Sequence, residues 1–292
     1  MSLPLPLVEH APAKVNLTLR IIGRRADGYH ELESLVAFAD INDRLRLTPG
    51  AELALAVSGP NAAQAGGSAD NLVLKAARAL AALVPGLTLG AFELEKNLPV
   101  AAGIGGGSTD AAAALRLLGR ANKLAADDPR LYAAAGSTGA DVPVCVAARP
   151  RLMHGIGEKL SPPIALPALS AVLVNPGAAL ATKDVFAGWT KASTPATPFD
   201  LLRLAKAASY KEFLRLLKPQ ENDLEAAAIA LAPVVAEVLA ALRALPGCGL
   251  ARMSGSGSTC FALFPSAAEA AAAEKIFSGK YPHWWVRACA LG

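Results

Sequence analysis

Polar and apolar residues alternate over residues 11–22 of this chain. The apolar set is Val15, Leu17, Leu19 and Ile21, and the polar set is Lys14, Asn16, Thr18 and Arg20. A period of two predicts a half-buried strand, so Lys14 and Asn16 are expected to share its polar face. The Asp27-Gly28 pair is a turn signal, and strand patterns follow it over residues 29–38, 44–47 and 52–57.

Helical and strand patterns are mixed through the rest of the chain. They predict helices over 71–83, 108–121, 129–135, 183–189, 199–206, 210–217, 222–244 and 266–278, and strands over 90–96, 142–147, 171–174, 249–254, 259–264 and 284–290. A proline-rich segment over 161–167 is the best candidate for a linker. The sequence therefore predicts an α+β fold in two lobes, with domains over 1–160 and 161–292.

Composition narrows the class of protein. The 292 residues are 53% hydrophobic, and the net charge of +4 is mild and not gathered into a dense basic block. This balance suits an anionic small-molecule substrate and argues against nucleic acid as the partner. The four cysteines are scattered without a C-x-x-C pair, and the N-terminal residues do not resemble a signal peptide. The longest apolar region, 224–245, is interrupted by charges and Pro233, so we expect a cytoplasmic protein without a membrane span.

A glycine-rich stretch over residues 99–110 carries the strongest chemical signal. Gly103 and Gly105 to Gly107 lie within five positions, and an alanine- and leucine-rich run follows Ser108. Backbone without Cβ atoms can approach an anion closely, and a helix beginning at an N-cap such as Ser108 would present free N–H groups there. The stretch fits neither G-x-x-x-x-G-K-[ST] nor G-x-G-x-x-G. It therefore predicts a phosphate site of another kind, with a helix-capping turn as the alternative.

Two further positions could carry chemistry. Asp141 precedes an apolar segment, and Lys14 lies on the polar face of the first strand. If the two meet, the lysine keeps the carboxylate ionised, and an ionised aspartate can accept the proton of a substrate hydroxyl. The alternatives are a turn-forming aspartate and a solvated lysine.

The histidines and a second glycine loop leave other possibilities open. Tyr29 and His30 follow a turn and could hold a nucleobase or simply form part of the core and its rim. The four histidines have no metal-ligand spacing. A glycine-serine loop over 253–259 is either a hairpin connection or a second close approach to a ligand.

Three motifs together resemble a known superfamily. They are Pro12-Ala-Lys-Val-Asn-Leu17, the segment from Leu98 to Ala112, and Met253-Ser-Gly-Ser-Gly-Ser258. In this order they resemble the GHMP kinases, whose fold is a two-lobed α+β arrangement with the active site in the inter-lobe cleft. The branch of this superfamily that acts on a cytidylated methylerythritol is indicated by five more segments. These are 23–32 (Gly-Arg-Arg-Ala-Asp-Gly-Tyr-His-Glu-Leu), 70–76, 139–143, 155–160 and 222–225.

The resemblance implies roles residue by residue. Asp141 would be the base for the substrate 2-hydroxyl and Lys14 its charge partner. Asn16 would contact the substrate, Tyr29 and His30 would hold the cytosine, and Phe186 would be the opposing aromatic. The positions implied for ATP are Asn71, Leu72, Lys96, Pro99, Val100, Ala101, Ala102, Gly103, Ile104, Gly105, Gly106, Gly107, Ser108 and Thr109.

The implied cofactors are ATP and Mg²⁺, and the implied partner is the small-molecule substrate 4-diphosphocytidyl-2-C-methyl-D-erythritol. The Mg²⁺ ligands, the roles of Asp110 and His154 and the oligomeric state (monomer or weak dimer) stay open. Two rival hypotheses are a kinase of another small alcohol, such as homoserine or mevalonate, and an ATP-binding sensor without turnover.

Overall fold

The computed structural model describes residues 6–65, 70–190, 203–204, 206–207 and 209–292. The chain divides into two compact units that are interleaved along the sequence. The first unit comprises Met1–Ala13, Ile41–Val100 and Gly105–Ala148, and the second comprises Lys14–Asp40, Ala101–Ile104 and Arg149–Gly292. The division into family domains at residue 160 stays a prediction.

Strands of the first unit come from β1 (Leu7–Asn16), β3 (His30–Gly50), β4 (Ala54–Ser58) and β5 (Leu89–Glu95). Strand β5 pairs antiparallel with the later part of β3, from Arg44 opposite Glu95 to Gly50 opposite Leu89, and parallel with β4. Alternate residues of β5 are buried, among them Phe92 and Leu94. One face of these strands is therefore apolar and needs a covering layer.

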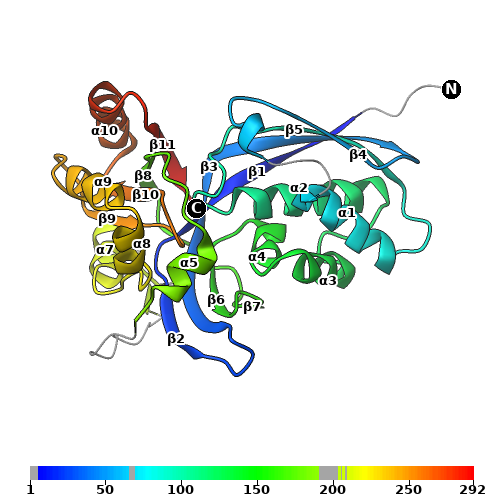
Figure 1. Cartoon of the computed structure of the whole chain (residues 1–292), viewed down its shortest axis with the longest axis horizontal. Helices are drawn as coiled ribbons and strands as arrows, with labels where there is room; N and C mark the ends of the chain where they lie inside the picture. The colour runs from blue at the N-terminus through cyan, green and yellow to red at the C-terminus, as the bar shows by residue number, and fades with distance from the viewer. Residues whose placement is uncertain (1–5, 66–69, 191–202, 205, 208) are drawn as a thin grey trace. The chain divides into compact units, whose positions relative to one another are not determined.

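Four helices supply that layer. They are α1 (Leu72–Leu83), α2 (Gly106–Ala121), α3 (Pro129–Thr138) and α4 (Val142–Ala147). They pack on one another, α1 against α2 and α3, and α2 against α4, and they lie together on one face of the strands (Figure 1). The four alanines from Ala111 to Ala114 are fully buried, and their small side chains let α2 sit close to its neighbours.

The second unit is built on antiparallel strands in the order β3-β11-β8-β10-β9. These strands are the first part of β3, β8 (Leu169–Asn175), β9 (Leu250–Met253), β10 (Cys260–Phe264) and β11 (Trp285–Leu291). Two further strands, β2 (Arg20–Arg24) and β6 (Arg151–Gly155), pair with β3, and β7 (Lys159–Leu160) pairs with β6.

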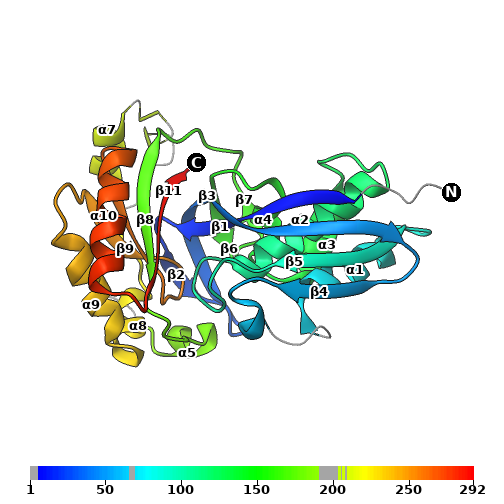
Figure 2. The ribbon, with the colours of Figure 1, turned by 90° about the horizontal axis from the view of Figure 1, so that it is seen from above.

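Helices of the second unit are α5 (Thr182–Ala187), α7 (Tyr210–Leu217), α8 (Glu225–Leu231), α9 (Val234–Arg243) and α10 (Ala267–Lys280). Helices α9 and α10 pack against β8, β9, β10 and β11, as the view from above shows (Figure 2). Val172, Val174, Phe264 and Phe277 belong to the apolar cluster between them. In the described residues, no helix is long and apolar enough to cross a membrane.

The α+β class is confirmed, and most predicted elements are found within a few residues of their predicted bounds. Residues 142–147, predicted as a strand, instead form helix α4. The valines suggested a strand, but Pro143 fits the first helical turn, where its missing N–H is not needed. The helix predicted over 222–244 is wrong as one element, because it breaks before Pro233 into α8 and α9. The helix predicted over 199–206 lies largely outside the described residues.

Two predictions about the ends and faces of elements are also wrong. Helix α2 begins at Gly106 after Gly105, whose φ of 65° is left-handed, so Ser108 is not its N-cap. Residues 11–22 do not form one half-buried strand, because β1 ends at Asn16 and Lys14, Asn16 and Thr18 are all buried. Both faces of this segment are covered, and alternation alone does not reveal burial of the polar face.

Candidate active site

Two of the residues predicted to act lie on β1 in the second unit. Lys14 is only 2% exposed, and its backbone N–H donates to the carbonyl of Ile104 at 2.9 Å. Asn16 donates through its side-chain amide to Ser34 Oγ at 2.7 Å. The Oδ1 atom of Asn16 is buried and has no partner among the described residues. A buried acceptor without a donor is costly, so Asn16 is set up to accept a hydrogen bond from a ligand.

An aromatic group also lies in the second unit. The rings of His30 and Phe186 are stacked, with centroids 5.1 Å apart and an interplanar angle of 27°. Trp189 meets His30 edge-on at 5.6 Å, whereas Tyr29 is 60% exposed. The structure thus brings His30 and Phe186 together, and it adds Trp189, which the sequence analysis missed.

Burial and the charge of Arg24 lower the pKa of His30. The imidazole is therefore neutral at neutral pH, with one nitrogen able to donate and the other able to accept. Such a ring can match the mixed donor and acceptor edge of a nucleobase.

The second glycine-serine loop contacts the middle of the first one within the second unit. Ser254 Oγ donates to the carbonyl of Gly103 at 2.9 Å and accepts from the backbone N–H of Asn16 at 3.0 Å. The φ of Gly103 is +74°, and an added Cβ would collide with the backbone of Ser254 and Gly257. This close approach of two backbones requires glycine and explains the small residues in both loops.

The segment from Asn222 to Glu225 acts as a clamp on that loop. The Asn222 side-chain amide donates to the carbonyls of Met253 at 2.9 Å and Gly255 at 2.8 Å. Glu225 accepts from the N–H of Met253 at 3.1 Å, and Asp223 accepts from the N–H of Ile21 at 2.7 Å. The buried Arg252 donates to the carbonyls of Leu17 and Gln220.

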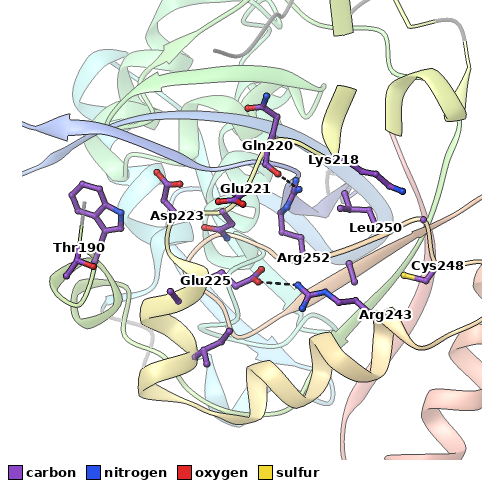
Figure 3. Close-up of a pocket in the computed structure, with 16 residues that line it drawn as sticks. Thr190, Lys218, Gln220, Glu221, Asp223, Glu225, Arg243, Cys248, Leu250 and Arg252 are labelled. Atoms are coloured by element: carbon purple, nitrogen blue, oxygen red, sulfur yellow. Dashed lines mark hydrogen bonds and ion pairs between the residues drawn. The ribbon is translucent and has the colours of Figure 1, made fainter. Parts of the chain in front are cut away.

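The segment from Asn222 to Glu225 and Arg252 contribute to the lining of a cavity of about 730 Å³ in the second unit. Figure 3 shows two of its charged groups engaged with the protein itself, Glu225 with Arg243 and Arg252 with the Gln220 carbonyl. None of the site residues predicted from the sequence lines this cavity. We therefore assign its polar lining to the clamp.

The ends of the glycine-rich loop belong to the first unit. Gly105 caps α2 in the left-handed conformation, so the first N–H groups of this 16-residue helix follow the loop directly. Asn71 caps α1 by accepting from the N–H of Val73 at 3.0 Å. A Cβ on Gly107 would touch Leu72 at 3.4 Å, so Leu72 packs beside the loop.

Asp141 lies in the first unit at the N-cap of the short helix α4, and it is partly exposed. Its carbonyl accepts from the Cys145 thiol at 3.1 Å. The local sequence favours this position because the helix begins at Val142, directly after Asp141, and Pro143 fits its first turn.

An ionic triad lies buried in the first unit. Lys96 Nζ donates to Asp43 Oδ2 at 2.5 Å and to Asp110 Oδ2 at 2.6 Å. All three side chains are at most 4% exposed. Asp43 Oδ1 accepts the backbone N–H groups of Asn97 at 2.6 Å and Leu98 at 2.8 Å. Lys96, predicted to lie around the nucleotide, thus has its ammonium held by two carboxylates.

Burial raises the pKa of Asp110 to about 7, against the lowering effect of Lys96. The attraction of Asp110 and Asp43 raises the pKa of Lys96, against the opposing effect of burial. The ammonium is therefore charged at neutral pH, while Asp110 is easily protonated. With one proton on Asp110 the triad has no net charge.

Sequence reasoning missed Asp43, although a signal was present. Asp43, Leu45 and Leu47 recur at a period of two, and so do Phe92, Leu94 and Lys96. Each series places a charged residue on an apolar face. The register of β3 and β5 pairs Arg44 with Glu95, so the next pair outward is Asp43 with Lys96. Two opposite charges on two apolar faces would have predicted a buried ion pair.

The class of protein follows from comparison with family models. The model described as the GHMP kinases N terminal domain matches residues 71–149, which include the glycine loop and Asp141. The model described as GHMP kinases C terminal matches residues 201–283, which include the second loop. The fold and both loops thus define a GHMP kinase.

Relatives and solved structures narrow the family. A 4-diphosphocytidyl-2-C-methyl-D-erythritol kinase of Rhodopseudomonas palustris (strain BisB5) is 56% identical, with 98% of this chain and 99% of the relative covered. Another from Bradyrhizobium sp. (strain BTAi1) is 56% identical, covering 98% and 97%. A crystal structure of 4-(cytidine 5′-diphospho)-2C-methyl-D-erythritol kinase aligns with a TM-score of 0.78 and 33% identity over 98% of this chain and 99% of that one. The chain belongs to the 4-diphosphocytidyl-2-C-methyl-D-erythritol kinases of the GHMP superfamily.

A structure of homoserine kinase from Cytophaga hutchinsonii shares the fold. It has a TM-score of 0.71 at 21% identity, and it covers 99% of this chain and 96% of that one. At this identity the likeness concerns the fold alone.

Proposed function

We propose that this chain transfers the γ-phosphoryl group of ATP to the 2-hydroxyl of 4-diphosphocytidyl-2-C-methyl-D-erythritol. The observation that carries the proposal is full-length identity above half with kinases named for that substrate. The hydroxyl oxygen forms a bond to the γ-phosphorus, the bond to the bridging oxygen breaks, and ADP leaves. Such a transfer depends mainly on positioning and on stabilising charge.

The proposed ATP site is the loop from Pro99 to Thr109 together with Asn71 and Leu72. The N-terminus of α2 and the glycine backbone offer N–H groups to phosphate oxygens. Lys96 contributes indirectly, because its ammonium is held by Asp43 and Asp110. Mg²⁺ would enter with ATP, since it is commonly held by phosphates and one or two side chains. The described residues contain no group of three or more His, Cys, Asp or Glu side chains suited to a metal.

The proposed acceptor site consists of Asn16, Tyr29, His30 and Phe186. The neutral imidazole of His30 would hydrogen-bond the cytosine, and Phe186 and the exposed ring of Tyr29 offer faces for stacking. Because the rings of His30 and Phe186 are stacked on each other, a base placed between them requires one of the rings to move. The buried Oδ1 of Asn16 would accept a hydrogen bond from a hydroxyl group of the substrate.

We propose Asp141 as the base that accepts the hydroxyl proton and Lys14 as the cation that stabilises the transferred charge. A small-molecule kinase of this kind uses cytoplasmic ATP, so we also propose a cytoplasmic location.

The test is ADP release from Mg-ATP with the purified protein. The acceptors offered are the cytidylated methylerythritol, methylerythritol phosphate without the cytidine group, homoserine and mevalonate. Turnover with the cytidylated acceptor alone is expected. Turnover with homoserine or mevalonate instead would replace the proposed substrate, and ATP binding without any turnover would favour a sensor.

Asp141→Asn tests the assignment of the base. We expect kcat to fall by about 10²- to 10⁴-fold, because a positioned base contributes that much to catalysis. The dissociation constant of a non-hydrolysable ATP analogue should change less than about twofold, since Asp141 is not proposed to bind phosphates. The matched control is Asp127→Asn, an exposed aspartate of the same unit. A variant that keeps most of its turnover would remove Asp141 from this role.

A further inference from the structure

The buried triad touches both ends of the glycine-rich loop. Asp43 Oδ1 accepts the N–H groups of Asn97 and Leu98, directly before the loop begins at Pro99. At the other end, Asp110 lies in the first two turns of α2, and its Oδ2 accepts from Lys96. Lys96 therefore joins the chain before the loop to the helix after it.

The triad also lies directly beneath the start of the helix. A Cβ built on Gly106 would come 3.1 Å from Lys96 Nζ and 3.8 Å from Asp43 Oδ2. Gly106 is the first residue of α2. The Lys96 ammonium therefore supports the first turn of α2, whose N–H groups are proposed to face the phosphates. A displaced ammonium would displace these N–H groups.

We infer that Asp43 and Asp110, bridged by Lys96, are positioning residues that fix both ends of the phosphate loop and thereby set the affinity for ATP. The inference rests on the proposed use of this loop for ATP. None of the three side chains needs to touch the nucleotide, since each is at most 4% exposed. They act through the backbone at positions 97, 98 and 106.

The charge of the triad gives this device a second property. The charged groups of the described chain that act on Asp110 are Lys96 and Asp43. When Asp110 loses its proton, the triad gains a net negative charge beneath a loop that must bind anionic phosphate. We therefore expect ATP affinity to weaken as pH rises through neutrality.

The experiment compares Asp43→Asn, Asp110→Asn and the control Asp127→Asn. The readouts are kcat, KM for ATP, KM for the cytidylated alcohol, and the dissociation constant of adenosine 5′-(β,γ-imido)triphosphate. In Asp43→Asn, the new NH₂ group is a donor, and it must point at another donor, either the Lys96 ammonium or the N–H groups of Asn97 and Leu98. The dissociation constant should rise about tenfold, the loss expected for a charge-assisted hydrogen bond, while KM for the alcohol stays within about twofold.

Asp110→Asn is the near-isosteric variant and carries the test if Asp43→Asn does not fold. Because the terminal phosphate of the analogue also titrates in this range, the two proteins are compared at each pH, and the ratio of the wild-type dissociation constant to that of Asp110→Asn should rise about threefold between about pH 6 and pH 8. A purely structural role would not produce this difference in pH dependence.

The outcomes separate the two proposals. A wild-type protein that turns over normally, with both variants matching its KM for ATP and its pH profile, would overturn the positioning role. An equal rise in both KM values would overturn it too, because the effect would then not be confined to the phosphate loop. A wild-type protein that binds no nucleotide would overturn the proposed function, and this inference with it.

Discussion

Each of the two units buries a polar assembly behind a glycine loop, and the two assemblies use opposite chemistry. In the first unit, the ionic triad of Asp43, Lys96 and Asp110 holds the chain on both sides of the loop. In the second unit, Asn222 and Arg252 donate mostly to backbone carbonyls and hold the loop after Met253. The first assembly balances charges, whereas the second satisfies backbone acceptors.

This difference determines what the removal of one residue costs in each assembly. Removing one member of a buried ion pair leaves an uncompensated charge, which costs more than the pair itself contributes. Removing a neutral donor leaves carbonyls without partners, which costs their desolvation. The triad should therefore respond to pH and to paired substitutions, and the hydrogen bonds from Asn222 should respond to neither.

The largest expected effect is on the triad, through Lys96→Met. The two carboxylates would stay buried without their cation, so the free energy of unfolding should fall by about 3–5 kcal/mol. Adding Asp110→Asn should recover part of this loss above about pH 7, because the amide replaces a buried carboxyl that must there either carry a charge or take up a proton. Urea unfolding of the single and double variants measures both. A double variant less stable than Lys96→Met would show that the triad is not held by charge balance.

A smaller loss is expected for the second assembly, through Asn222→Ala. The carbonyls of Met253 and Gly255 would lose their donors, at a cost of about 2 kcal/mol in unfolding free energy. The loss should be the same at about pH 6 and pH 8, because neither partner titrates there. Thermal unfolding at the two pH values checks this. A strongly pH-dependent loss would erase the contrast between the two assemblies.

The smallest effect, counted per pH unit, is a slope that distinguishes the wild type from Asp110→Asn. The folded protein raises the pKa of Asp110 from 3.8 to about 7, so the folded state holds this proton more tightly than the unfolded chain does. The stability that this proton contributes is present at low pH and is lost as pH rises towards about 7.

Relative to Asp110→Asn, the wild type should lose at most about 1.4 kcal/mol per pH unit between about pH 4 and pH 7. Urea unfolding of both proteins across that range measures the slope. If the wild type instead gains stability with rising pH, then pairing with Lys96 outweighs burial and Asp110 is ionised throughout.

Much of the fold could be predicted from the sequence, for local reasons. Asn71 caps α1, and the helix over 210–217 and the strand over 259–264 match α7 and β10. The short helix α4 was missed because six residues are too few for a helical period to show among valines. The two polar residues Lys14 and Asn16 were expected on an open face and are buried.

The sequence by itself determined the class of protein and the residues that could carry its chemistry, because glycine loops and the Tyr29-His30 pair are local signals. Only the tertiary structure decided what those residues touch. It joined Asp43, Lys96 and Asp110, which lie far apart along the sequence. It also brought Asn222 to Met253 and Phe186 to His30. The physical reason is that strand register and helix packing set these distances, and both depend on contacts between segments far apart in the chain.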